Sequence, residues 1–166
     1  MKIIDNFLDE NYHKEIHNLL MGWGFPWYFH DTLTHGVYDL DAIGFNYNLT
    51  AENQPLFIPL VEKMESALSA QNAHCIRLRA DMTTYNPNGY KHGYHVDCEI
   101  PHTVCIYYVN DSDGNTCIRG HQGPSDEHEV EPKANRLLIF DGKLYHTGHS
   151  PKRHKNRILI NANFTV

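Results

Sequence analysis

The stretch Thr103-Val104-Cys105-Ile106-Tyr107-Tyr108-Val109 has the two-residue period of a β-strand and sets the fold class of this 166-residue sequence. Three further segments have the same character, at residues 75–80, 136–140 and 157–164. Turn clusters separate them at residues 86–89, 111–115 and 141–142, where Asn, Pro, Asp and Gly gather. Short strands separated by such turns predict a β-sandwich or barrel.

Two helices are expected before these strands. Asp9 is placed to cap the first helix, which ends near Gly22, and residues 24–29 are expected to be extended. The second helix begins around Pro55, and its apolar residues recur at three- and four-residue steps. Both helices should pack on one outer face of a mainly β protein. The organisation we expect is one domain over residues 1–166, with helical support over about 1–72 and a β core over about 73–166.

The composition excludes several classes of protein. The 20 acidic residues outnumber the 14 basic ones, and a net charge of -6 argues against a main task of binding nucleic acid. No apolar run approaches the ~20 residues of a membrane span, and the start of the chain turns acidic too soon for a secretory signal. A cytoplasmic protein is therefore expected. The four cysteines form no C-x-x-C pair, which predicts free thiols and neither disulfides nor a Cys-based zinc site.

Histidine is the unusual component, with 13 residues. His95 and Asp97 lie two apart in the β half, after a Gly-rich turn, so their side chains can share one face of a strand. His13 and Glu15 have the same spacing, but they fall in the first expected helix. Two residues apart on a helix point about 200° from each other, so this second pair is rejected as a chelator.

A metal site needs a third ligand, and His146 is the best candidate. It follows a hydrophobic strand and a turn, where the chain would re-enter a barrel mouth. Two His and one carboxylate are the ligands of non-haem Fe(II) oxygenases; the alternative for His146 is a hydrogen-bonded loop histidine. His149 and His154 fall in a polar loop and are expected at the surface. Arg157 opens the last strand, where its guanidinium is suited to a bidentate pair with a carboxylate.

Assembled in this order, these residues resemble the Fe(II)/2-oxoglutarate-dependent oxygenases, whose core is a double-stranded β-helix of jelly-roll type. The flanking residues 84–89, 94–97, 104–110 and 130–140 resemble those of the prolyl 4-hydroxylases, particularly the hypoxia-sensing ones. The resemblance covers roughly residues 75–166. It implies that the fold is this jelly roll, with the N-terminal helices packed on one outer face.

The resemblance also implies roles for individual residues. His95, Asp97 and His146 would hold Fe(II), and Arg157 would pair with the distal carboxylate of 2-oxoglutarate. Tyr108 matches a tyrosine that hydrogen-bonds the same carboxylate, and Tyr85 matches one whose hydroxyl faces the cosubstrate pocket. Tyr107 and Tyr108 point to opposite faces of their strand, so only one of them can do this. O2 would be the third reactant, and a requirement for ascorbate stays open.

The implied activity is hydroxylation of a C–H bond in a protein or peptide side chain, with release of succinate and CO2. Peptidyl-proline is the first choice of substrate, with no nucleic acid or membrane partner and a monomeric or weakly dimeric state. The alternatives are an oxygenase acting on a nucleobase or small molecule, and a non-catalytic β-barrel that binds a ligand. Residues 113–116 and 119–124 depart from the family pattern. In this acidic sequence, the basic run over residues 152–157 is the one segment whose charge suits an acidic cosubstrate.

Overall fold

A computed structural model describes residues 1–34, 39–68, 72–120 and 125–165. In these ranges the N-terminal half forms β1 (Lys2–Ile4), α1 (Glu10–Met21), β2 (Tyr28–His30), β3 (Gly44–Asn48), the 3₁₀ turn η1 (Pro55–Phe57) and α2 (Ile58–Leu68). The rest forms β4 (His74–Thr84), β5 (Thr103–Tyr108), β6 (Thr116–Arg119), β7 (Glu127–Val130), β8 (Arg136–Asp141), β9 (His146–Gly148) and β10 (Asn156–Thr165).

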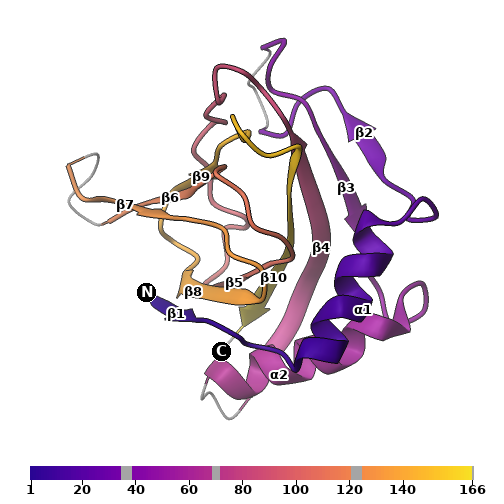
Figure 1. Ribbon diagram of the computed structural model, residues 1–166. Coiled ribbons are helices and arrows are strands. Elements are labelled where there is room, and N and C mark those ends of the chain that lie inside the picture. Colours follow the sequence, from indigo (N-terminus) through magenta and orange to yellow (C-terminus); the bar gives the residue numbers. More distant parts are fainter. Residues whose placement is uncertain (35–38, 69–71, 121–124, 166) are drawn as a thin grey trace.

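The strands form two antiparallel sheets of unequal size (Figure 1). The large sheet has the order β1-β8-β5-β10-β4-β3-β2, and the small sheet has the order β7-β6-β9. β10 lies at the middle of the large sheet, between β4 and β5. The last strand of the chain is therefore held on both edges, and its side chains project from the centre of both faces.

Helices α1 and α2 cover one face of the large sheet, on the side away from the small sheet (Figure 1). The Asp9 carboxylate caps α1 by accepting a hydrogen bond from the Asn11 amide at 2.9 Å. Each helix buries one stripe of apolar residues against the sheet. The resulting core contains, from helices and strands, Ile16, Leu20, Leu60, Met64, Ala80, Cys105, Tyr107, Leu137, Ile160 and Phe164.

The opposite face of the large sheet forms a second core with the small sheet. Its members are Val104, Ile106, Tyr108, Ile118, Val130, Leu138, Phe140 and Leu159. Successive residues of β5 alternate between the two cores, so this strand is buried on both faces. The large sheet thus separates a purely structural core from the interior of a two-sheet barrel.

The sequence-based expectations for the main elements are confirmed. The first helix begins after Asp9 and ends before Gly22, and the second region becomes helical at Pro55. The four expected strands are present as β4, β5, β8 and β10. The short strands of the small sheet and the N-terminal strand β1 were not expected, since three or four residues carry little periodic signal. All four cysteines are free thiols, as predicted. None of the helices in the described ranges is both long and apolar enough to span a membrane.

Candidate metal and cosubstrate site

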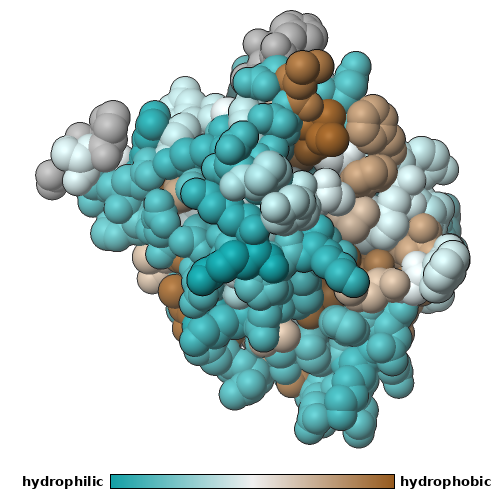
Figure 2. All heavy atoms as spheres, turned by 45° about the horizontal axis from the view of Figure 1, so that its top comes forward, coloured by the Kyte–Doolittle hydropathy of each residue, from teal (hydrophilic) through white to brown (hydrophobic). Residues whose placement is uncertain are grey.

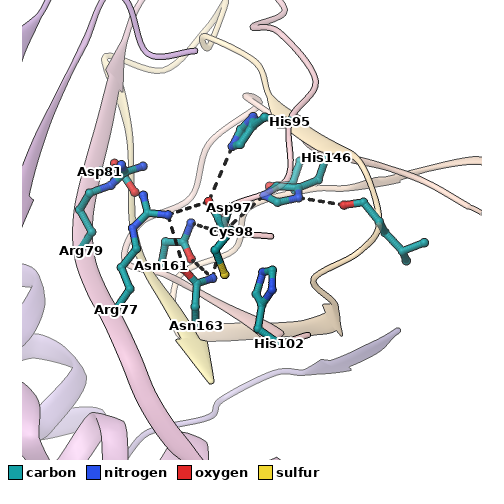
Figure 3. A network of polar contacts seen from close by, with 12 residues as sticks. Arg77, Arg79, Asp81, His95, Asp97, Cys98, His102, His146, Asn161 and Asn163 are labelled. Carbon is teal, nitrogen blue, oxygen red and sulfur yellow. Dashed lines mark hydrogen bonds and ion pairs between the residues drawn. The ribbon is translucent and has the colours of Figure 1, made fainter. Parts of the chain in front are cut away.

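Three side chains converge inside the barrel: His95, Asp97 and His146 (Figure 3). A β-bridge pairs His95 with His146, and their backbone amides and carbonyls exchange hydrogen bonds of 3.0 and 2.9 Å. Nε2 of His95 lies 3.8 Å from one oxygen of Asp97, and Nε2 of His146 lies 3.7 Å from the other. These distances are too long for hydrogen bonds but fit two ligands of one ion with bonds of ~2.1 Å.

Both imidazoles are oriented through their other nitrogen. Nδ1 of His95 lies 3.2 Å from the Gly93 carbonyl, and Nδ1 of His146 lies 3.1 Å from the Leu144 carbonyl. A proton on Nδ1 leaves the Nε2 lone pair free to bind a metal. Nε2 of His146 is buried and has no hydrogen-bond partner among the described residues. A buried nitrogen aimed at another imidazole and a carboxylate fits a divalent ion such as Fe(II).

The Asp97 carboxylate is fixed from the side opposite the histidines (Figure 3). Arg77 donates to one oxygen at 2.9 Å, and Asn163 and Asn161 donate to the other at 2.9 and 3.1 Å. Burial alone would raise the pKa of this carboxyl. The charges of His146 and Arg77 and the two amides outweigh burial, so the pKa of Asp97 is held well below its usual range. Asp97 is therefore ionised at neutral pH, as a metal ligand must be.

Arg157 lies in the same cavity as a buried cation. Its Nη2 donates to Thr116 Oγ1 at 2.7 Å, and the Tyr108 hydroxyl donates to the same oxygen at 2.7 Å. Its Nε is buried without a partner, and no carboxylate of the described residues lies within ion-pair distance of Arg157. An unpaired buried guanidinium is costly, and a carboxylate ligand would supply the missing partner.

Most residues that line the cavity joining Arg157 to the two histidines are polar. Its lining includes Arg79, Asp81, Thr83, His92, Thr116, Thr147, Asn161, Leu33 and Leu159. Arg79 and Asp81 form an ion pair of 2.7 Å in its wall. The wall combines imidazoles that could bind a metal with a guanidinium that could bind an acid, so it suits a small polar ligand beside a metal ion.

The two tyrosines left open by the sequence lie on opposite sides of the sheet. Tyr108 lies beside Arg157, whereas the Tyr107 hydroxyl contacts Nδ1 of His13 at 2.6 Å, under the helices. Tyr85 lies just past the end of β4, is 55% exposed and does not line the cavity. The expected position of its hydroxyl in the pocket is therefore not observed, because the chain leaves the sheet after Thr84.

The basic run over residues 152–157 does not form one acid-binding patch. The Asp113 carboxylate accepts hydrogen bonds from the amides of Lys152, Arg153 and His154. Only Arg157, where β10 begins to alternate, points into the cavity. The segment at residues 113–116, which departs from the family pattern, thus holds this loop through Asp113. It also supplies Thr116, which contacts Arg157 in the cavity. His149 also differs from expectation, since it is half-buried with Nε2 3.3 Å from Cys117 Sγ.

Sequence reasoning missed the residues that position the site. Arg77, Asn161 and Asn163 hold Asp97, and Thr116 joins Tyr108 to Arg157. The signal for the two asparagines was present: Asn161 and Asn163 lie two residues apart in a largely apolar stretch of β10, so they share one face of the strand. Arg77 and Thr116 carried no such signal, because each gains its role only through pairing between distant strands.

Comparison with solved structures identifies proteins that share the fold of this chain. No family model matches the sequence, and no curated protein does. A prolyl hydroxylase from Trichoplax adhaerens, in complex with a hypoxia inducible factor peptide fragment, is similar with a TM-score of 0.74 at 15% identity; the match covers 98% of this chain and 82% of that one. A prolyl-4-hydroxylase from Pseudomonas putida is similar with a TM-score of 0.72 at 15% identity, over 99% and 92% of the chains.

The chain has the fold of the 2-oxoglutarate/Fe(II) oxygenases. The jelly roll implied by the sequence resemblance is thereby confirmed. HygX from Streptomyces hygroscopicus, with nickel and 2-oxoglutarate bound, is also similar, with a TM-score of 0.68 at 13% identity over 98% of this chain and 81% of that one. Prolyl hydroxylases and HygX, which has also been solved with hygromycin B bound, share this fold, so the fold leaves the substrate open.

Two buried imidazoles in the cavity make stability depend on pH. Burial, as the largest cause, lowers the pKa of His92 and that of His146 to about 4 each. Between that value and an unfolded pKa of about 6.5, the unfolded chain binds more protons than the folded one. The contribution of these two imidazoles to the free energy of unfolding of the metal-free protein is thus fully present above pH 6.5. It is lost as the pH drops towards 4.

We expect a loss of about 2 kcal/mol per imidazole between pH 6.5 and pH 5. Urea unfolding with a chelator at several pH values measures it. His92→Gln should reduce the slope, while replacement of the exposed His128 by Gln should not. Equal stability at pH 7 and pH 5 would contradict the assignment.

Proposed function

We propose that this protein is an Fe(II)- and 2-oxoglutarate-dependent dioxygenase that hydroxylates a C–H bond of a protein or peptide side chain. The observation that carries the proposal is that one cavity holds a free metal-binding nitrogen and an unpaired cation. Among the described residues, Nε2 of His146 has no hydrogen-bond partner and the Arg157 guanidinium has no carboxylate partner. A metal ion would bind the first, and a dicarboxylate that chelates this ion could reach the second.

The proposal gives a role to each metal ligand and to the residues around Arg157. His95, Asp97 and His146 would hold Fe(II) through two neutral imidazoles and one carboxylate, which leaves positive charge for an acidic cosubstrate. Arg157 would bind the distal carboxylate of 2-oxoglutarate, with Tyr108 and Thr116 fixing the guanidinium. When bound, iron, 2-oxoglutarate and O2 would supply the oxidising chemistry, with succinate and CO2 as coproducts. The barrel walls orient the reactants and limit access of water.

The cavity wall also contains a charge that the cosubstrate must tolerate. A free carboxylate at Asp81 would repel a dianion, but Arg79 lies 2.7 Å from it and neutralises it. Burial raises the pKa of Asp81, while Arg79 opposes that rise. The pair thus presents polar groups without net charge, which suits the amide groups of a peptide.

A hydrophobic surface next to the cavity favours a substrate larger than a metabolite. The exposed apolar side chains Tyr28, Phe29, Leu40 and Ile43 lie on β2 and on the segment leading to β3. Leu33, which lines the cavity, belongs to the same segment and is tied to it by a 2.9 Å hydrogen bond to the Ala42 carbonyl. Figure 2 shows a gathering of hydrophobic residues on one part of an otherwise largely hydrophilic face. Such a patch can hold the flanks of a peptide.

Peptidyl-proline is our first choice of substrate, on the basis of the sequence resemblance and the fold shared with prolyl hydroxylases. A small polar molecule is the second choice, because most residues that line the cavity are polar. A nucleobase is disfavoured: where such relatives typically carry a second arginine, this chain has Asn163, which holds Asp97. The net charge of -6 also opposes phosphate binding.

Mass spectrometry of a peptide library tests the function. Peptides are incubated with purified protein, Fe(II), 2-oxoglutarate and O2, and succinate is measured in parallel. We expect a gain of one oxygen atom on proline-containing peptides, and no gain when the proline is replaced by alanine or when the enzyme carries His146→Ala. Succinate release with oxidation of a different residue would overturn only the choice of proline. Absence of 2-oxoglutarate binding would overturn the function itself.

A further inference from the structure

The small sheet brings three potential metal ligands together on its outer face. Cys117 lies on the central strand β6, directly opposite Glu129 on β7. His149 lies just after β9 on the other edge, where its amide donates to the Asn115 carbonyl at 3.0 Å. β6, β7 and the residue just after β9 therefore each contribute one side chain of a different chemical type.

The donor atoms are close enough to share one ion. The Cys117 thiol, one nitrogen of His149 and a carboxylate oxygen of Glu129 all lie within 4.8 Å of one another. Sγ of Cys117 lies 3.3 Å from Nε2 of His149. The Asn115 amide donates to Glu129 at 2.9 Å and holds that carboxylate in place. Cys117 is fully buried, His149 is half-buried and Glu129 is exposed, so the cluster opens to solvent on the Glu129 side.

This cluster is separate from the His95–Asp97–His146 site. Residues of β6 alternate between the faces of the small sheet, so Thr116 and Ile118 point into the barrel and Cys117 points outward. His146 likewise faces the barrel interior. The two clusters lie on opposite faces of one sheet and share no ligand.

We infer that Cys117, Glu129 and His149 form a second metal site that binds Zn²⁺, with water as the fourth ligand. Thiolate, imidazole and carboxylate are the three ligand types that zinc uses, and a tetrahedral ion with one open position needs three of them. The thiolate also distinguishes this site from the sulfur-free site in the barrel, because soft sulfur favours zinc over Fe(II). The inference does not depend on the proposed function.

The sequence could not indicate this site. It contains no C-x-x-C pair, which led to the expectation that no Cys-based zinc site exists. The three ligands lie 12 and 20 residues apart along the chain and meet only through the pairing of β6 with β7 and β9. An ion held there would bridge all three strands of the small sheet. Those strands also carry Thr116 and His146, so the ion would stiffen the wall of the barrel site.

Zinc binding at this site should release a proton. Zinc binds the thiolate form of cysteine, whereas a free thiol is mostly protonated at neutral pH, so the metal displaces the proton. Calorimetry in buffers of different ionisation enthalpy would detect that release.

Cobalt(II) absorption spectroscopy tests the proposal directly. Co(II) occupies zinc sites, and a thiolate ligand gives a charge-transfer band in the near ultraviolet that imidazole and carboxylate ligands do not give. We expect the band in the parent protein and in His146→Ala, in which the barrel site is disabled. We expect it to vanish in Cys117→Ser, to remain in the control Cys75→Ser, and to disappear when Zn²⁺ is added. Because Glu129 is exposed, Glu129→Gln should fold normally and weaken the binding about tenfold or more.

Thermal unfolding provides a second readout. Zn²⁺ should raise the unfolding midpoint of His146→Ala, and it should leave the midpoint of His146→Ala/Cys117→Ser unchanged. Absence of the band from the parent protein, or its persistence in Cys117→Ser, would overturn the site. An unchanged affinity in Glu129→Gln would also overturn it as a three-ligand site. None of these outcomes alters 2-oxoglutarate binding in the barrel, so this proposal and the proposed function can fail separately.

Discussion

Replacing His146 with alanine should abolish metal binding in the barrel. His146 is 3% exposed and supplies the buried nitrogen of the site, and without it only His95 and Asp97 remain as ligands. Two ligands do not hold Fe(II) well, so we expect the affinity to fall more than about 100-fold, beyond the effect of changing a supporting residue. Calorimetry with Mn(II) measures this without redox chemistry. Mn(II) prefers oxygen and imidazole ligands, so the Cys117 cluster contributes little to the signal.

His154→Ala is the matched control for this experiment. His154 lies eight residues further along the chain, binds Asp113 at 2.8 Å and does not line the cavity. The control should bind Mn(II) as the parent protein does. Undiminished binding by His146→Ala would refute the assignment of the barrel site.

Replacing Arg157 with alanine should abolish 2-oxoglutarate binding while metal binding is retained. Removing one partner of a buried charge pair costs about 2–5 kcal/mol, which corresponds to a factor of about 30 to several thousand in affinity. Arg157→Lys keeps the charge but loses the planar fork that contacts Thr116, so its affinity should be intermediate. Calorimetry with 2-oxoglutarate in the presence of Mn(II) compares these variants.

The exposed Arg153 provides the control for Arg157. Its side chain is 79% exposed and contacts Asp113 rather than the cavity, so Arg153→Ala should bind 2-oxoglutarate as the parent protein does. If Arg153→Ala weakened binding as much as Arg157→Ala did, the basic run as a whole would be the recognition element. Unchanged binding by Arg157→Ala would show that 2-oxoglutarate does not bind at this end of the cavity.

Much of the fold followed from the sequence because its long elements are periodic. The alternation over residues 103–109 and 157–164 and the helical spacing after Pro55 reflect burial against one neighbour, which is a local property of the chain. The spacing of His95 and Asp97 was informative for the same reason, since two residues on a strand share a face. The candidate barrel site could therefore be proposed before its geometry was known.

The remaining features depend on contacts between distant segments. Thr116 gains its role only because β6 lies beside Tyr108 and Arg157, and Asn163 only because β10 passes under Asp97. Tyr85 matched a motif, but the path of the chain after β4 turns it to the surface. The cluster of Cys117, Glu129 and His149 could not be predicted for the same reason. Its residues meet through the pairing of three short strands, and the spacing of residues along the sequence does not reveal that pairing.

The alternation along β10 has a consequence for how this protein can evolve. Ile158, Ile160 and Ala162 face the helices, whereas Arg157, Asn161 and Asn163 face the barrel interior. Neighbouring residues of this one strand therefore serve different purposes: one side chain stabilises the fold, and the next contributes to the chemistry of the cavity. Substitutions on the inner face can alter what the cavity accepts while the hydrophobic layer under the helices stays intact.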